Sequence, residues 1–195
     1  DESLFKPESI AKKQSYVVGL GRITPAKNVQ KAIQCISLIP RDIRPELKWI
    51  SNGYEPHYFE QIRQIALELG VHFSPLIDIP DDSLVRVINE AAVLLYTSHL
   101  EPFGLAPIEA NMCGTSAIAI AEGGVRESIR HGINGLLVNG NCLSEIADHI
   151  VEFTTDLAYA EEMGNKARNH ALEFWNWQRM ADNIENELMS LLKQD

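Results

Sequence analysis

The feature that most constrains the fold is a regular alternation of short apolar runs and longer amphipathic segments along the 195 residues. Short apolar runs that end in glycine or polar residues are typical of buried strands. We predict six strands, at 15–21, 47–53, 71–74, 92–98, 115–121 and 134–138. We predict helices between them, at 27–39, 58–70, 81–91, 105–113 and 125–132, and a mostly helical tail over 143–193.

This alternation predicts an α/β fold, a Rossmann-like open doubly wound parallel sheet of about six strands with a helical C-terminal tail. Ligands bind to such sheets beyond the carboxyl ends of the strands. The loops that follow predicted strands are therefore where a binding site is expected.

Composition argues against several classes of protein. The net charge of −10 disfavours a general nucleic-acid binder, which would carry a basic face. The sequence shows no apolar run long enough for a membrane span and no signal-peptide pattern at residue 1. Its three cysteines form no C-x-x-C pair, which fits small core residues in a reducing cytoplasm. Histidine and aspartate spacings suggest no metal site.

The loop after the first predicted strand, GLGRITPAKN, carries two cations. Gly19 and Gly21 resemble the start of a dinucleotide fingerprint, but the third glycine is missing, so nicotinamide binding is disfavoured. Arg22 and Lys27 flank Pro25 at the expected ligand edge, an arrangement suited to phosphates. The alternative is that both are solvated surface side chains.

The stretch EPFGLAPIE, residues 101–109, opens and closes on a glutamate. Glu101 falls in the loop after a predicted strand. Proline is tolerated in a helix only within the first turn, so Pro107 predicts a helix that starts near Leu105 and is entered at Gly104. The first N–H groups of that helix have no intrahelical partner and form an anion site suited to a phosphate or diphosphate.

The two glutamates lie on either side of this expected anion site. Glu109, about one turn into the helix, can reach a neutral polyol such as a ribose diol. Glu101 can accept hydrogen bonds from hydroxyl groups of whatever the phosphate carries. The alternative is that both only complement the helix dipole or lie in water. A second glycine-opened turn, Gly123-Gly124, is either a further helix N-terminus at this edge or a turn that needs positive φ.

Residues 101–138 strongly resemble the donor-binding half of the retaining, nucleotide-sugar-dependent glycosyltransferases of the GT-B fold, group 1 (family 4). That family carries E-x-F-G-L-x-x-x-E-A, then a small-residue strand, a G-G turn and G-x-N-G-x-L-V. The segment GRITPAKNVQKAI resembles its G-R…K-N loop, DESLFKP the end of its interdomain linker and EFWNWQRMADNI its final helical segment. These matches follow the family's order and cover nearly the whole chain.

The resemblance implies roles for matching residues. Arg22 and Lys27 would hold the diphosphate, Glu109 would bond the ribose hydroxyls and Glu101 would orient the transferred sugar. The implied catalytic set is Glu101, Arg22 and Lys27, and the implied donor-binding set is Gly21, Phe103, Gly104, Leu105, Glu109 and Leu76. Leu76 is the candidate for packing on the base, whose identity stays open because Pro75 and SNG depart from the family's pattern.

The resemblance also implies a reaction and a domain arrangement. A hexose-type sugar would pass from a nucleoside diphosphate to an acceptor with retention, without a metal or other cofactor. Residues 1–12 would end an interdomain linker, 13–175 would form the nucleotide-sugar-binding domain, and the helix at 176–195 would pack toward an absent N-terminal domain.

The implied partners are the sugar donor and that acceptor-binding N-terminal domain, with peripheral membrane association through it and no nucleic acid. The domain alone would then be inactive. The alternatives are a free-standing nucleotide-sugar binding or regulatory module and an epimerase or phosphorylase of the same architecture.

Overall fold

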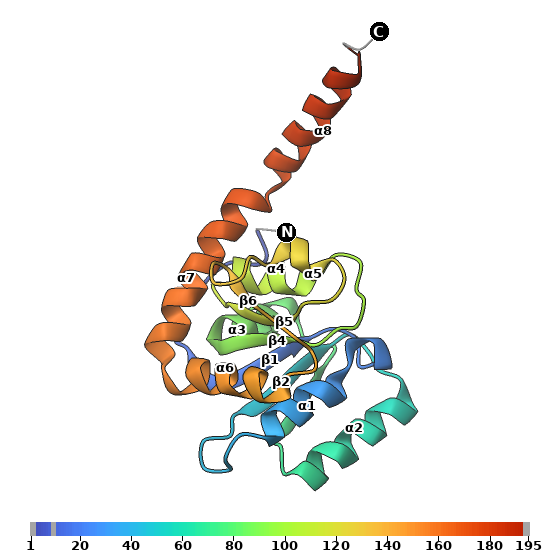
Figure 1. Cartoon of the computed structure of the whole chain (residues 1–195), viewed down its shortest axis with the longest axis vertical. Coiled ribbons are helices and arrows are strands. Elements are labelled where there is room, and N and C mark those ends of the chain that lie inside the picture. The colour runs from blue at the N-terminus through green and yellow to red at the C-terminus, as the bar shows by residue number, and fades with distance from the viewer. Residues whose placement is uncertain (1–2, 9–10, 193–195) are drawn as a thin grey trace.

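The computed structural model describes residues 3–8 and 11–192. Residues 1–2 and 9–10 of the predicted linker and residues 193–195 of the predicted last helix therefore lie outside the described residues. The described strands form one parallel sheet in the order β3-β2-β1-β4-β5-β6 (Figure 1). Their bounds are Gln14–Leu20 (β1), Glu46–Ser51 (β2), Phe73–Ile77 (β3), Ala91–Tyr96 (β4), Ala117–Ile120 (β5) and Gly135–Val138 (β6). This confirms the predicted doubly wound α/β fold of six strands.

Helices cover both faces of the sheet, as expected where parallel strands are buried on two sides. One face carries α1 (Val29–Ser37), α2 (Pro56–Leu69) and α6 (Leu143–Thr155). The other carries α3 (Asp81–Glu90), α4 (Leu105–Met112) and α5 (Val125–Ser128). The long α7 (Leu157–Phe174) contributes side chains to both, and α8 (Trp177–Leu192) follows it.

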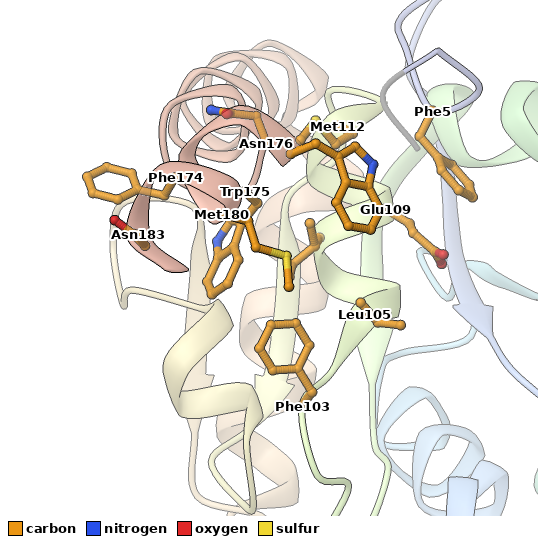
Figure 2. Close-up of a pocket in the computed structure, with 12 residues that line it drawn as sticks. Phe5, Phe103, Leu105, Glu109, Met112, Phe174, Trp175, Asn176, Met180 and Asn183 are labelled. Atoms are coloured by element: carbon orange, nitrogen blue, oxygen red, sulfur yellow. The ribbon is translucent and has the colours of Figure 1, made fainter. Parts of the chain in front are cut away.

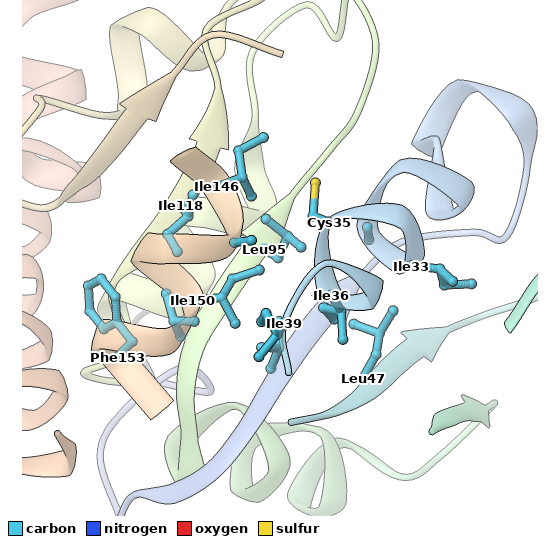
Figure 3. Packing of buried hydrophobic residues seen from close by; sticks show 14 of the residues in the cluster. Ile33, Cys35, Ile36, Ile39, Leu47, Leu95, Ile118, Ile146, Ile150 and Phe153 are labelled. Atoms are coloured by element: carbon cyan, nitrogen blue, oxygen red, sulfur yellow. The ribbon is translucent and has the colours of Figure 1, made fainter. Parts of the chain in front are cut away.

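The core consists of two layers because successive strand residues point to opposite faces. In β1, Val17 belongs to the layer under α1 and α6, whereas Val18 belongs to the layer under α3 and α4. Figure 3 shows the first layer, in which Ile36, Leu95 and Ile150 come from α1, β4 and α6. All six residues of β4 are buried, as the continuous apolar run AAVLLY predicts.

Most element boundaries differ from the sequence predictions by one or two residues, and the two largest differences, at the ends of β3 and α5, have identifiable reasons. The third strand runs to Ile77 instead of ending at residue 74, because Pro75 and Leu76 pair with β2. Proline is tolerated there since β3 is an edge strand. Helix α5 stops at Ser128, where the buried Asn134 side chain donates to the Ser128 carbonyl at 2.9 Å.

The C-terminal helix α8 projects away from the body of the domain (Figure 1). It has an apolar stripe that is largely exposed, including Trp177, Ile184 and Leu188 at 69%, 52% and 57%. The helical tail is confirmed, whereas the division into linker, domain and final helix stays a prediction. Among the described residues, no helix combines the length and apolar character that a membrane crossing requires.

Candidate functional site

The loops after β1 and β4 meet where the strand order reverses. The chain runs outward from β1 to β3 and then returns to the other side of β1 as β4. The Thr97 hydroxyl donates to the Lys27 carbonyl at 3.0 Å, and the His99 amide donates to the Ala26 carbonyl at 2.9 Å. Such a switch point is where open α/β sheets bind their ligands.

An ion pair occupies this switch point. Lys27 Nζ lies 2.6 Å from Oε1 and 2.5 Å from Oε2 of Glu101, and the two side chains are 21% and 29% exposed. Gly21, with φ of 134°, lies against the same lysine, since a Cβ at this position would be 3.0 Å from Lys27 Cε. The structure therefore brings three of the predicted residues together.

The surroundings of Glu101 keep its carboxylate charged. Burial by itself would raise the pKa of Glu101, but the Lys27 ammonium and the neighbouring hydroxyl groups of Tyr96 and Ser98 more than offset it. The net effect is a pKa below the usual value for glutamate.

The start of α4 lies next to this pair. Helix α4 begins at Leu105 after Gly104, which has φ of 87°, and Pro107 lies in the first turn, as predicted. Gly104 is packed closely, because a Cβ would lie 3.3 Å from Ser128 Oγ. Helix N-termini attract anions through their free N–H groups, and α4 begins four residues after the ion-paired Glu101.

The Gly123-Gly124 turn supports the loop that carries Glu101. The Gly124 amide donates to the Glu101 carbonyl at 2.9 Å. A Cβ on Gly123 would lie 2.4 Å from that carbonyl oxygen, and one on Gly124 would lie 1.9 Å from the Pro102 carbonyl oxygen. These glycines permit close backbone packing, and Gly123 also has the positive φ of 66° that the turn alternative requires.

Two predicted residues lie further from the ion pair. Arg22 is exposed at the start of the loop after β1. Its guanidinium carbon lies 3.8 Å from the point that a Cβ on Gly53 would occupy. Leu76 lies within edge strand β3, half-buried against the second core layer, and not in the loop where we expected it. Strand β2 lies between β3 and β1, and both β2 and β1 lie between β3 and β4. Leu76 is therefore on a different part of the sheet from the loops that carry Lys27 and Glu101.

Phe103, Leu105 and Glu109 line a separate groove of about 600 Å³ between α4 and the start of α8. Phe103 packs edge-on against Trp175, with ring centroids 5.3 Å apart. In Figure 2, Phe103 and Trp175 lie on one side of the groove, and the Glu109 carboxylate lies on the side of Phe5. Leu105 is largely exposed.

Glu109 differs electrostatically from Glu101. Burial raises the pKa of Glu109, and its carboxylate has no hydrogen-bond or ion-pair partner among the described residues. An unpartnered carboxylate in a largely apolar groove can accept hydrogen bonds from a neutral polyol, which is the role that the sequence predicts for it.

The sequence analysis missed several polar residues at the switch point. Tyr96 and Ser98 lie beside Glu101, and His99 Nδ1 lies 2.7 Å from Glu122 Oε2, which ties the β4 loop to the glycine turn. The available signal was the polar stretch YTSH directly after an apolar strand, immediately before Glu101.

Other sequence expectations can be compared with the structure. Cys35 and Cys113 are buried as expected, whereas Cys142 is exposed. Over the residues that the structure describes, no group of three or more His, Cys, Asp or Glu side chains is placed to hold a metal ion. The expectation that no metal takes part stays a prediction.

Comparison with known proteins places this geometry in a family. Residues 1–170 match the family of glycosyl transferases group 1. N-acetyl-alpha-D-glucosaminyl L-malate synthase of Bacillus anthracis is 24% identical over 192 residues, which are 98% of this chain and 50% of that protein. The chain thus spans about half the length of this curated relative.

Solved structures show the same fold. HepE of Anabaena in complex with UDP superposes with a TM-score of 0.83 at 22% identity, over 97% of this chain and 55% of that one. The C-terminal domain of the group 1 glycosyl transferase family protein LpcC from Francisella tularensis superposes with a TM-score of 0.76 at 19% identity. The match covers 91% of this chain and 98% of that one. The chain therefore belongs to the group 1 glycosyl transferases and has the fold of a GT-B C-terminal domain.

Proposed function

We propose that this chain is the nucleotide-sugar-binding domain of a retaining glycosyltransferase that moves a hexose-type sugar from a nucleoside diphosphate to an acceptor. The observation that carries the proposal is the Lys27–Glu101 pair at the sheet's switch point, beside the N-terminus of α4. A cation and a helix start suit a diphosphate, and a charged carboxylate next to them suits the hydroxyl groups of a sugar.

The proposed chemistry relies on electrostatics. As the sugar departs, negative charge grows on the diphosphate, and Lys27, Arg22 and the first N–H groups of α4 would stabilise it. Glu101 would orient the sugar through hydrogen bonds and is not proposed as a glycosidase-type nucleophile. Glu109 would hold the ribose hydroxyls. No metal is part of this proposal, because these cationic groups supply the compensating charge.

We further propose that the isolated domain binds donor but transfers no sugar. The chain spans about half of its curated relative, and a second domain would supply the acceptor site. The exposed apolar stripe of α8 favours this reading over a free-standing binding module, because contiguous exposed apolar surface marks an interaction site. Sustained transfer by the purified chain alone would contradict it.

Calorimetric titration tests donor binding. UDP, GDP and ADP, each with and without glucose, are titrated into the wild type and Lys27→Ala. We expect one base to be preferred and Lys27→Ala to weaken that binding about 10- to 100-fold, because a hydrogen bond to a charged group is lost. Lys166→Ala is the matched control, since Lys166 pairs with Glu162 on the surface of α7. Unchanged binding by Lys27→Ala, or no binding by the wild type, would contradict the proposal.

A further inference from the structure

A second cavity, of about 560 Å³, lies at the opposite edge of the sheet from the switch point. It forms where the amino ends of strands meet, because Lys13 directly precedes β1, and Cys113 and Gly114 come shortly before β5. The proposed donor site lies in the loops that follow the carboxyl ends of β1 and β4. The proposed function therefore does not explain the polar groups of this second cavity.

Two acceptors hold the Lys13 side chain at the cavity. Its nitrogen donates to the Asn89 carbonyl oxygen at 2.9 Å and to the Thr115 hydroxyl oxygen at 2.6 Å. The Thr115 hydroxyl donates its own hydrogen to the Ile88 carbonyl oxygen at 2.6 Å, so it acts as an acceptor toward Lys13. Two acceptors satisfy the two N–H groups of an uncharged amine and leave its lone pair free, whereas an ammonium ion has a third N–H group.

The surroundings of Lys13 disfavour its ammonium form. Among the described residues, no carboxylate lies within ion-pair distance of its nitrogen. Burial lowers the pKa of Lys13 to about 7, and the neighbouring Cys113 and Glu161 offset this effect only in part. Because an exposed lysine has a pKa of about 10.4, the uncharged amine is about a thousand times more abundant at Lys13 than at an exposed lysine at pH 7.

The other titratable side chains at the cavity leave Lys13 as its nucleophile. They are Glu8 and Lys12 from the segment before β1, Cys113 after α4 and Glu161 on α7. Burial raises the pKa of the Cys113 thiol to about 12, so this sulfur stays protonated and unreactive. Lys12 is exposed, which makes it the natural comparison for its neighbour Lys13.

We propose that Lys13 is a modification site whose uncharged amine takes up the acyl group of small acyl phosphates. The nitrogen lone pair attacks the carbonyl carbon, an N–C bond forms, and the bond between that carbon and the phosphate oxygen breaks. Phosphate leaves with the electron pair of the broken bond, and the nitrogen loses one proton to solvent. Lysine amines that burial has deprived of charge are suited to such attack. The amide product keeps one N–H group, so it can bond Asn89 or Thr115 but not both.

Acetylation of the wild-type chain by acetyl phosphate, followed for each lysine by peptide mass spectrometry, tests the proposal. At pH 7 we expect Lys13 to react at least about tenfold faster than Lys12, because the greater abundance of uncharged amine outweighs its lower basicity and narrower access. The rate at Lys13 should level off above about pH 8, whereas an ordinary lysine does so only above about pH 10. Equal rates at the two lysines, or no acetylation of Lys13 between pH 6 and pH 9, would overturn the proposal.

The same reaction in denaturant separates the fold from the local sequence. Lys12 and Lys13 should then react at equal rates, because unfolding removes the cavity and both acceptors of Lys13. A preference for Lys13 that persisted in denaturant would show that the fold does not create the reactivity, and would contradict the proposal.

A charge variant tests the electrostatic origin of the reactivity. Glu161→Gln removes a negative charge that favours the ammonium form, so the pH at which the Lys13 rate is half its maximum should fall. Glu162→Gln is the matched control, because Glu162 is the next residue of α7 and pairs with Lys166 on the surface. A shift of equal size in both variants, or in neither, would be inconsistent with a reactive Lys13 in this cavity.

Discussion

Glu101 and Glu109 flank the start of α4, yet their surroundings are opposite. Glu101 is bonded through both oxygens to Lys27, and its pKa lies below the usual value. Glu109 has no partner among the described residues, and burial raises its pKa. The comparison shows that one helix start can place two identical side chains in two environments, one that keeps the charge and one that opposes it.

This difference matters for the proposed roles. The Glu101 carboxylate shares a cation with the expected diphosphate site and keeps acceptor sites free for sugar hydroxyl groups, whereas the Glu109 carboxylate, without a partner among the described residues, is suited to a neutral ribose. The Glu101 side thus depends on a charged neighbour, whereas the Glu109 side does not. Substitutions on one side at a time can therefore separate the two roles.

The largest expected effect comes from the support beneath Glu101. Gly124→Ala should destabilise the domain by about 1–3 kcal/mol, because the added Cβ would lie 1.9 Å from the Pro102 carbonyl oxygen and the loop must shift. Chemical denaturation measures this loss. Gly132→Ala is the control, since its Cβ meets nothing within 4 Å and only the φ of 78° is strained, at about 1 kcal/mol. A smaller loss for Gly124→Ala than for Gly132→Ala would contradict the supporting role of the glycine turn.

A smaller effect separates the two carboxylates by ligand. Glu109→Ala should weaken the binding of a nucleoside diphosphate and of its sugar conjugate equally, by about tenfold, because both ligands contain the ribose. Glu101→Ala should weaken the sugar conjugate more than the free diphosphate. Titration of each variant with both ligands gives the loss of affinity for the free diphosphate and for the sugar conjugate. Glu162→Ala is the control, because Glu162 is exposed on α7. If both variants lowered the two affinities by the same factor, the division of roles would be wrong.

The smallest effect is a contrast in pH dependence. Glu101 has a lowered folded pKa, so its contribution to stability is present at neutral pH and is lost as pH falls through that folded pKa. Glu109 has a raised folded pKa, so its cost is present at neutral pH and disappears as pH falls below its unfolded value. The opposite signs make the comparison specific to these two groups.

Urea denaturation between pH 7 and pH 4 measures this contrast. Glu101→Gln should be less stable than the wild type at pH 7, and Glu109→Gln more stable. Both differences should shrink toward pH 4. A Glu109→Gln variant that loses stability at pH 7 would show that the carboxylate has a partner in solution.

Much of the fold could be predicted from local sequence patterns. The strand-and-helix alternation indicated the sheet, and Pro107 with Gly104 located the start of α4. Proline is restricted by its ring to the first turn, and glycine alone readily adopts the positive φ that precedes this helix. The end of β3 was misjudged because strand pairing with β2, which involves Pro75 and Leu76, outweighs the local signal of a proline.

The sequence by itself therefore determined the elements, the order of loops at the ligand edge and the family resemblance. Only the tertiary structure decided that Lys27 and Glu101, 74 residues apart, form an ion pair, and that the hydroxyl groups of Tyr96 and Ser98 lie beside Glu101. It also decided that Glu109 faces a groove shared with the start of α8. The physical reason is that steric limits act between neighbours in the chain, whereas charge environments depend on which distant strands and helices the sheet order brings together.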